Sequence, residues 1–256
     1  MRILVTNDDG IHALGLLALR AALLRLGEVV AIAPDRPRSA CGHAVTLHKP
    51  LRLTPVELPG GTGYASNGTP SDCVALGVGE QVGPAPDLVV AGINAGPNLG
   101  WDLTYSGTVA AAMEAAICGL PSIAISVTSY TATDFAQAAE FAAYLSQVVI
   151  QHGLPQDTFL NVNVPALPAS EIKGVAVTHQ GRLIYENRIE RRTDPRGGDY
   201  YWFSGDRVDH RGQPGSDIEA VAKNRISVTP VHLDLTDHTM LARLRVWDLT
   251  WPGKIT

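Results

Sequence analysis

Residues 2–34 read RILVTNDDGIHALGLLALRAALLRLGEVVAIAP, and this stretch decides the fold. The apolar run at 2–7 contains β-branched residues and predicts a buried strand. Residues 11–27 are apolar on more than one helical face and end in Gly27, which predicts a well-buried helix with a glycine stop. The apolar run at 28–34 predicts a second strand, closed by a proline. A strand, a helix and a strand in so short a stretch favour a parallel pair with a right-handed crossover.

The same alternation continues along the chain. The sequence predicts helices at 71–79, 106–119 and 134–153, and strands at 87–94, 121–127 and 159–165. Alternating strands and helices of this kind predict an α/β fold with a doubly wound, mainly parallel sheet.

The composition of the sequence changes after about residue 170. Glycine, proline, arginine and aromatic residues crowd 181–216, which predicts an extended arm or hairpin. A short helix at 217–224, a late strand at 225–231 and a tail at 232–256 follow. We therefore expect one domain over 1–256, with its core at 1–170 and the arm, late strand and tail at 171–256.

Composition excludes several classes of function. The chain has 256 residues, 45% of them hydrophobic and 18% charged, which is typical of a globular protein. The formal net charge of −5 argues against a broad surface for nucleic-acid polymers or anionic membranes. No run reaches the roughly 18 apolar residues of a membrane span, and the N-terminal residues lack the pattern of a signal peptide. Three widely spaced cysteines without a CxxC pair indicate a reducing, cytoplasmic compartment.

Polar residues gather in the loops that follow the predicted strands. In an open parallel sheet, ligands bind in the crevice beyond the carboxyl ends of the strands. Asp8 and Asp9 follow the first strand, Ser39 lies in the loop after the second, and Asn94 ends the third. Each feature alone has an ordinary structural explanation as a turn, a solvent-facing loop or a helix cap. Together they place hard oxygen donors at three strand ends.

This set of donors suits a hard divalent cation such as Mg²⁺ or Mn²⁺. Adjacent carboxylates repel each other unless water or a cation separates them. Ser106, Gly107 and Thr108 open a predicted helix, and their N–H groups suit an anion. A cation beside an anion cradle is typical of sites that act on phosphate.

Several phosphate-binding and hydrolytic classes are excluded by their motifs. The chain has no GxGxxG after the first strand, no GxxxxGK[ST] and no GxSxG. The haloacid-dehalogenase phosphatases carry DxD after the first strand, whereas Asp8 and Asp9 are contiguous. Response-regulator receivers need an acceptor aspartate at the end of a later strand, where this chain has Asn94.

Five spaced motifs closely resemble the survival protein E (SurE) family of nucleotidases. They read MRILVTNDDGIHALG (1–15), APDRPRSA (33–40), GTPSDCVALG (68–77), DLVVAGINAGPNLG (87–100) and YSGTVAAAMEAA (105–116). The likeness continues through DPRGGDYYWF (194–203) and RISVTPVHLDLT (225–236), so it covers nearly the whole chain in the family's order.

The resemblance implies a Rossmann-like core and a metal-dependent phosphatase acting on nucleoside 5′- and 3′-monophosphates, and in some members on short polyphosphate. It implies one divalent metal ion per subunit, with ligands falling on Asp8, Asp9, Ser39 and Asn94, of which Asp8 and Asp9 carry the catalysis. The phosphate-binding turn falls on 106–108, and Asn98 lines the pocket. It also implies a homodimer or homotetramer whose C-terminal arms are exchanged between subunits.

The chain departs from the commoner family form at Leu14, at Ala40 and at Trp101, where that form has proline, glycine and an acidic residue. All four ligand positions keep their residue types, so the departures bear on base preference and loop motion at the pocket mouth. We expect water as the nucleophile, with the carboxylate of Asp8 as an alternative, and His43 as the candidate group near the leaving oxygen.

Two other functions fit the same residues. A nucleotide or metal sensor on this fold would bind a nucleoside monophosphate and release it unchanged. A phosphatase of sugar phosphates or other small phosphomonoesters would share the site and differ only at the pocket mouth.

Overall fold

The computed structural model describes residues 1–183, 188–205, 213–247, 249, 251 and 253. In these residues nine strands form one sheet in the order β3-β4-β2-β1-β5-β6-β7-β11-β8. Its five central strands are mutually parallel. They are β2 (Glu28–Pro34), β1 (Arg2–Thr6), β5 (Leu88–Ala95), β6 (Ser122–Val127) and β7 (Thr158–Val164). The predicted α/β fold with a doubly wound, mainly parallel sheet is confirmed.

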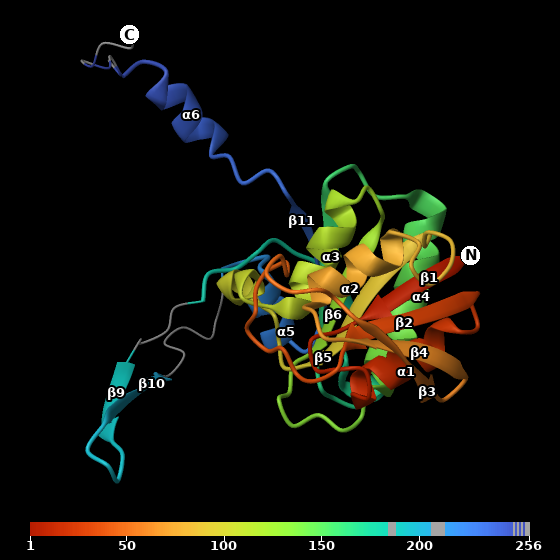
Figure 1. Ribbon diagram of the computed structural model, residues 1–256. Coiled ribbons are helices and arrows are strands. Elements are labelled where there is room, and N and C mark those ends of the chain that lie inside the picture. Colours follow the sequence, from red (N-terminus) through yellow and green to blue (C-terminus); the bar gives the residue numbers. More distant parts are fainter. Residues whose placement is uncertain (184–187, 206–212, 248, 250, 252, 254–256) are drawn as a thin grey trace.

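Four helices cover the two faces of this sheet (Figure 1). One hydrophobic core joins α1 and α4 to the sheet, and a second joins α2 and α3 to its other face. The helices are α1 (Leu14–Leu23), α2 (Pro70–Val78), α3 (Gly107–Ile117) and α4 (Ala136–His152). At 17 residues α4 is the longest described helix, and none of the described helices is long and apolar enough to cross a bilayer.

Helix α1 begins three residues later than the sequence predicts. The backbone N–H of Ile11 donates to the carbonyl of Pro34 at 2.9 Å, and that of Ala13 donates to Gly10. Residues 7–13 are therefore a turn tied to the end of β2, and the paired acids lie in this turn and not in a helix.

Toward the edges of the sheet, the late strand predicted at 225–231 is confirmed, whereas three further strands were not predicted. At one edge β3 (Leu53–Leu58) pairs antiparallel with β4 (Gly61–Ser66), which pairs parallel with β2. At the other, β11 (Ile226–His232) runs antiparallel to β7 and parallel to β8 (Val175–Val177). Edge strands are partly exposed and tolerate proline, glycine and polar residues, so β3, β4 and β8 lack the apolar run that marked the central strands.

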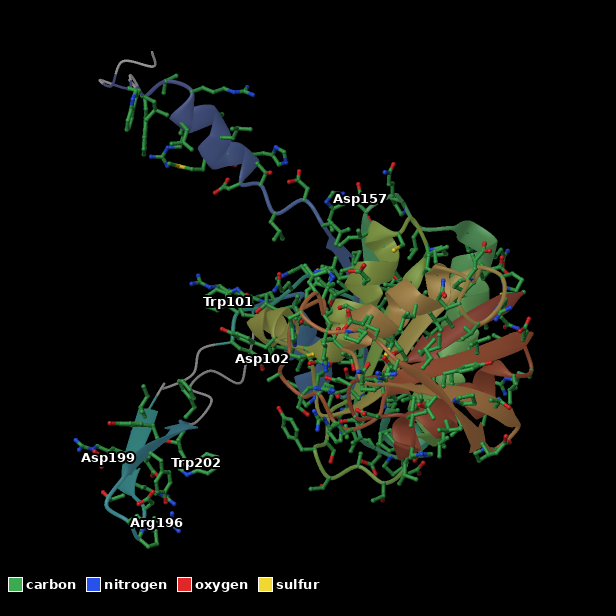
Figure 2. All side chains as sticks on the ribbon, in the orientation of Figure 1. Trp101, Asp102, Asp157, Arg196, Asp199 and Trp202 are labelled. Atoms are coloured by element: carbon green, nitrogen blue, oxygen red, sulfur yellow. The ribbon has the colours of Figure 1, made fainter. Side chains whose placement is uncertain are left out.

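The predicted arm is a two-stranded antiparallel hairpin of β9 (Arg188–Thr193) and β10 (Asp199–Ser204). It stands away from the body, as Figure 2 shows through the labelled Arg196, Asp199 and Trp202. Parts of the predicted arm, 184–187 and 206–212, lie outside the described residues.

Shorter helical elements complete the described chain. The late helix is α5 (Asp217–Ala222), and the tail contains a helix that the sequence analysis did not assign, α6 (His238–Leu244). Two short 3-10 helices are η1 (Gly100–Thr104) and η2 (Ala169–Glu171). Helix α6 has no buried residue and projects from the body beyond β11 (Figure 1).

Candidate active site

A cavity of about 440 Å³ opens at the carboxyl ends of β1, β5 and β6. Strands β1 and β5 are the neighbours at which the strand order reverses, and ligands bind at this point in open α/β sheets. The cavity brings together most of the predicted site residues with several that were not predicted. It is lined by Asp8, Asp9, Ser39, Ala40, Asn94, Ala95, Pro97, Asn98, Asp102, Tyr105, Ser106 and Tyr130.

A larger cavity of about 610 Å³ lies beyond the ends of β6 and β7. Its lining contains one carboxylate, Asp134, which accepts a hydrogen bond from the backbone N–H of Ala136 at the start of α4. This cavity lacks the paired acids, so the smaller one is the candidate active site.

Asp8 is a buried carboxylate held by the first turn of α3. The hydroxyl of Thr108 donates to Asp8 Oδ1 at 2.6 Å. Burial raises the pKa of Asp8, while hydrogen bonds from the Thr108 hydroxyl and nearby backbone N–H groups act against that rise. A Cβ on Gly107 would lie 2.8 Å from Asp8 Cβ and 3.0 Å from Asp8 Oδ2. Glycine at 107 therefore lets α3 approach the carboxylate.

Asp9 adds a second charge beside the first. Burial and then repulsion by Asp8 raise the pKa of Asp9, and the N–H of Ala95 donates weakly to it across 3.5 Å. Among the described residues neither carboxylate has a cationic partner, and burial disfavours the charged form of both. A cation placed between them would reverse this cost.

Backbone hydrogen bonds hold the loop that carries Ser39 on both sides of this residue. The N–H of Arg38 donates to the carbonyl of Asp8 at 2.7 Å, and the N–H of Gly42 donates to that of Tyr105 at 3.0 Å. Further along, Thr46 donates twice to Asp72 at the start of α2. Burial alone would raise the pKa of Asp72, but these bonds and those from Thr69 lower it. Because these hydrogen bonds hold the loop, Ser39 lies in the cavity wall although its side chain is exposed.

Two of the remaining predicted residues also contribute to the cavity, one with a ligand oxygen and the other with a helix dipole. Asn94 donates from its amide nitrogen to the Gly96 carbonyl at 2.8 Å, which leaves its Oδ1 as the available ligand atom. Ser106 caps α3 by accepting from the N–H of Val109, so the positive end of that helix faces the cavity. The structure does not place Gly107 and Thr108 in the cavity lining. Both contact Asp8 instead, and the Thr108 hydroxyl donates to its carboxylate.

His43 lies outside the lining of the cavity. Its Nε2 contacts Glu114 Oε2 on α3 at 2.6 Å. Its role near the leaving group stays a prediction, since this contact directs the ring toward α3.

Asn98 is fixed by residues that the sequence analysis missed. Its N–H donates to Asn163 Oδ1 at 2.8 Å, and its side chain donates to Ser126 at 2.8 Å. Its carbonyl accepts from both Asn161 and Asn163. Two asparagines at alternate positions in the apolar run FLNVNV were the available signal, because a buried amide needs a partner.

The base of the arm is tied to the loop that carries Asn98. Asp217, at the start of α5, is fully buried and accepts from the N–H groups of Gly100 and Gly181. Gln180 also donates to the Gly100 carbonyl at 3.0 Å. The position of the β5–α3 loop therefore depends on residues 80 and 117 positions away.

Replacing Asn163 by alanine should loosen Asn98. The change leaves the buried backbone N–H of Asn98 without an acceptor, while its carbonyl keeps only the bond from Asn161. We therefore expect kcat/KM for phosphate release to fall about 10- to 100-fold. Ser227→Ala is the matched control. Ser227 pairs with Asn163 in the β11–β7 register, and its buried hydroxyl has no partner, so its loss should leave kcat/KM unchanged. Equal rates in both variants would contradict a positioning role for Asn163.

The chain matches a known protein family over most of its length. The family model described as survival protein SurE matches residues 3–187, more than half of the chain. The chain belongs to the SurE family. This membership confirms the resemblance that the five motifs suggested.

Individual SurE proteins are similar over nearly their whole length. The 5′-nucleotidase SurE of Geobacter sulfurreducens is 53% identical over 251 residues, which cover 98% of this chain and 95% of that protein. The 5′-nucleotidase SurE of Moorella thermoacetica is 49% identical and covers 99% of both chains. The crystal structure of the SurE protein from Aquifex aeolicus is 42% identical, with a TM-score of 0.84 over 96% of this chain and 98% of that one.

Proposed function

We propose that this SurE-family protein is a divalent-metal-dependent 5′-nucleotidase, which hydrolyses nucleoside 5′- and 3′-monophosphates to nucleoside and phosphate. The observation that carries the proposal is the pair Asp8 and Asp9 beside the N-terminus of α3 in the lining of one cavity. Relatives that are 49% and 53% identical over nearly the whole chain are named 5′-nucleotidase SurE.

The residues of the cavity fit one hard divalent ion per subunit, Mg²⁺ or Mn²⁺. Asp8 and Asp9 would supply carboxylate oxygens, Ser39 a hydroxyl and Asn94 an amide oxygen. The lining within the described residues contains no lysine or arginine, so a phosphate beside two carboxylates needs another positive charge. The described residues also hold no group of three or more His, Cys, Asp or Glu that suits a metal, which argues against a zinc site rich in such ligands.

Each site residue then has a defined task. Such an ion would supply Lewis-acid polarisation of the phosphoryl oxygens. Thr108 fixes the orientation of Asp8, and the positive end of the α3 dipole at Ser106 would stabilise charge that develops on the equatorial oxygens. Asn98, held by its buried network, would orient the phosphate. The Thr108 hydroxyl occupies Asp8 Oδ1, which favours water over Asp8 as the nucleophile.

Phosphate release from a panel of substrates tests the proposal. The panel contains 5′- and 3′-nucleoside monophosphates, ribose 5-phosphate and short polyphosphate, assayed after chelation and again with Mg²⁺ or Mn²⁺ restored. We expect release that requires the metal, with kcat/KM highest for nucleotides. Nucleotide binding without phosphate release under either metal would instead support the sensor. A preference for ribose 5-phosphate would support the broader phosphomonoesterase.

We also propose that the protein forms a homodimer or homotetramer with exchanged C-terminal arms. The hairpin exposes Tyr201, Trp202 and Phe203, and the tail beyond α6 exposes Trp247. Apolar surface of this extent is typical of protein interfaces. Light scattering on the full chain should give a mass of two or four subunits.

A further inference from the structure

Two tyrosines line the active-site cavity and yet stand largely in solvent. Tyr130 is 74% exposed and Tyr105 is 67% exposed, and both belong to the same cavity as Asp8 and Asp9. Neither residue is used by the hydrolytic machinery described above. An exposed aromatic ring at the mouth of a phosphate site is suited to contact the part of the ligand that is not phosphate.

The ring of Tyr130 is supported by the backbone of the neighbouring strand end. Gly96, with φ +123°, lies so close that a Cβ there would be 2.5 Å from both Cδ1 and Cε1 of the Tyr130 ring. One part of the ring therefore rests on the main chain at Gly96, while most of the side chain remains exposed. A supported ring with an open surface can stack on a flat ligand with little loss of side-chain freedom.

The position of Tyr130 along the cavity separates it from the phosphate end. Asp8 follows β1, Gly96 follows β5, and Tyr130 follows β6, so the cavity runs across three neighbouring strand ends. Two inter-strand spacings amount to about 10 Å. A ribose can bridge such a span between a phosphate at one end and a base at the other. Tyr105, by contrast, directly precedes the α3 cap Ser106 and belongs to the phosphate end.

We propose that Tyr130 is a specificity-determining residue that stacks on the base of the bound nucleotide. The inference rests on the proposed nucleotidase function and names the part of the substrate that this wall of the cavity recognises. Every base presents a π face, so stacking binds all bases and favours purines, which have the larger rings. The site should therefore accept several nucleotides and discriminate strongly against phosphomonoesters without a base.

Kinetics of Tyr130→Ala on two substrates test the inference. For 5′-AMP we expect KM to rise about tenfold or more, the scale of a lost base–aromatic stack, with kcat changed less than twofold. For ribose 5-phosphate, which keeps the phosphate and the sugar, KM should stay within twofold. Tyr130→Phe keeps the ring and should restore the KM of the unaltered protein. Tyr144→Ala, an exposed tyrosine on the outer face of α4 and away from the cavity, is the matched control and should change neither KM.

Three results would overturn the inference. They are an unchanged KM for 5′-AMP in Tyr130→Ala, an equal rise of KM for ribose 5-phosphate, and a failure of Tyr130→Phe to restore binding. A larger rise of the KM for 5′-AMP in Tyr105→Ala than in Tyr130→Ala would show that the base binds at Tyr105, and would overturn the inference as well.

Calorimetric titration with adenosine separates this inference from the proposed function. If the unaltered protein releases no phosphate from any nucleotide, the proposed function fails. Adenosine binding that weakens about tenfold in Tyr130→Ala would then still support the stacking role. Inorganic phosphate should bind equally to both proteins. Loss of phosphate binding in Tyr130→Ala would show that the ring acts at the phosphate end of the cavity, and would overturn the inference.

Discussion

Asp8→Asn is expected to lower kcat/KM for 5′-AMP by about a thousandfold or more and to weaken the binding of Mn²⁺ in the same variant. Asparagine has the shape of aspartate, and its Oδ1 can still accept from Thr108, so the local fold should be retained. What the substitution removes is the negative charge that would hold the cation. Steady-state kinetics and isothermal titration with Mn²⁺ measure the two effects separately.

The same substitution should stabilise the metal-free protein. Burial disfavours the charged form of Asp8, and a neutral amide removes both that cost and its repulsion of Asp9. We expect Tm of the chelated protein to rise by about 2–4 °C for each kcal/mol gained. Loss of activity together with a higher Tm identifies a residue kept for function and not for stability.

Asp157→Asn is the matched control for Asp8→Asn. Asp157 precedes the amino end of β7, at the opposite end of the parallel strands from the cavity, and Figure 2 shows it far from Asp102 in the cavity wall. Its φ of +57° is one that asparagine tolerates well. Activity and Mn²⁺ binding should match those of the unaltered protein. Full activity in Asp8→Asn would remove the basis of the assigned site.

Gly107→Ala is expected to lower kcat/KM by about a hundredfold, because small displacements of catalytic groups have effects of this size. The added Cβ would lie 2.8 Å from Asp8 Cβ and 3.0 Å from Cys41 Sγ, so either Asp8 or the first turn of α3 must move. Both belong to the proposed site: Asp8 would hold the cation, and the N-terminus of α3 would face the phosphate.

Gly119→Ala, at the other end of the same helix, provides the control. Gly119 has φ +78°, so alanine there costs about 1–2 kcal/mol of stability through backbone strain. No atom lies within 4 Å of the added Cβ, and the site is untouched. Both glycine variants should lose stability in thermal melts, but only Gly107→Ala should lose activity. An equal loss of activity in both would attribute the effect to stability alone.

The central sheet and the paired acids were predictable because their signals are local. The apolar runs at 2–7, 28–34 and 121–127 need nothing but their own side chains to indicate buried strands. The rule that ligands bind at the carboxyl ends of parallel strands then predicted that Asp8, Asp9 and Asn94 lie together. Family membership rested likewise on motifs that are contiguous in sequence.

The edge strands and the supporting residues were not predictable in this way. Strand β3 carries Pro55 and is largely exposed, and it is a strand only because β4 pairs with it. Asn163 reads as a polar interruption of an apolar strand until Asn98, 65 residues away, supplies its partner. Tyr130 reads as an ordinary loop residue until Gly96 is seen beneath its ring.

The sequence by itself determined the fold class, the family and the acids that define the site, because backbone periodicity and short motifs are properties of neighbouring residues. Only the tertiary structure decided how the site residues and their loops are held: Thr108 bonds Asp8, Asn163 bonds Asn98, and Asp217 bonds Gly100. Each of these contacts joins residues 65 or more positions apart. Such pairs form when the packed sheet and helices fix both partners, and no local pattern in the chain encodes that distance.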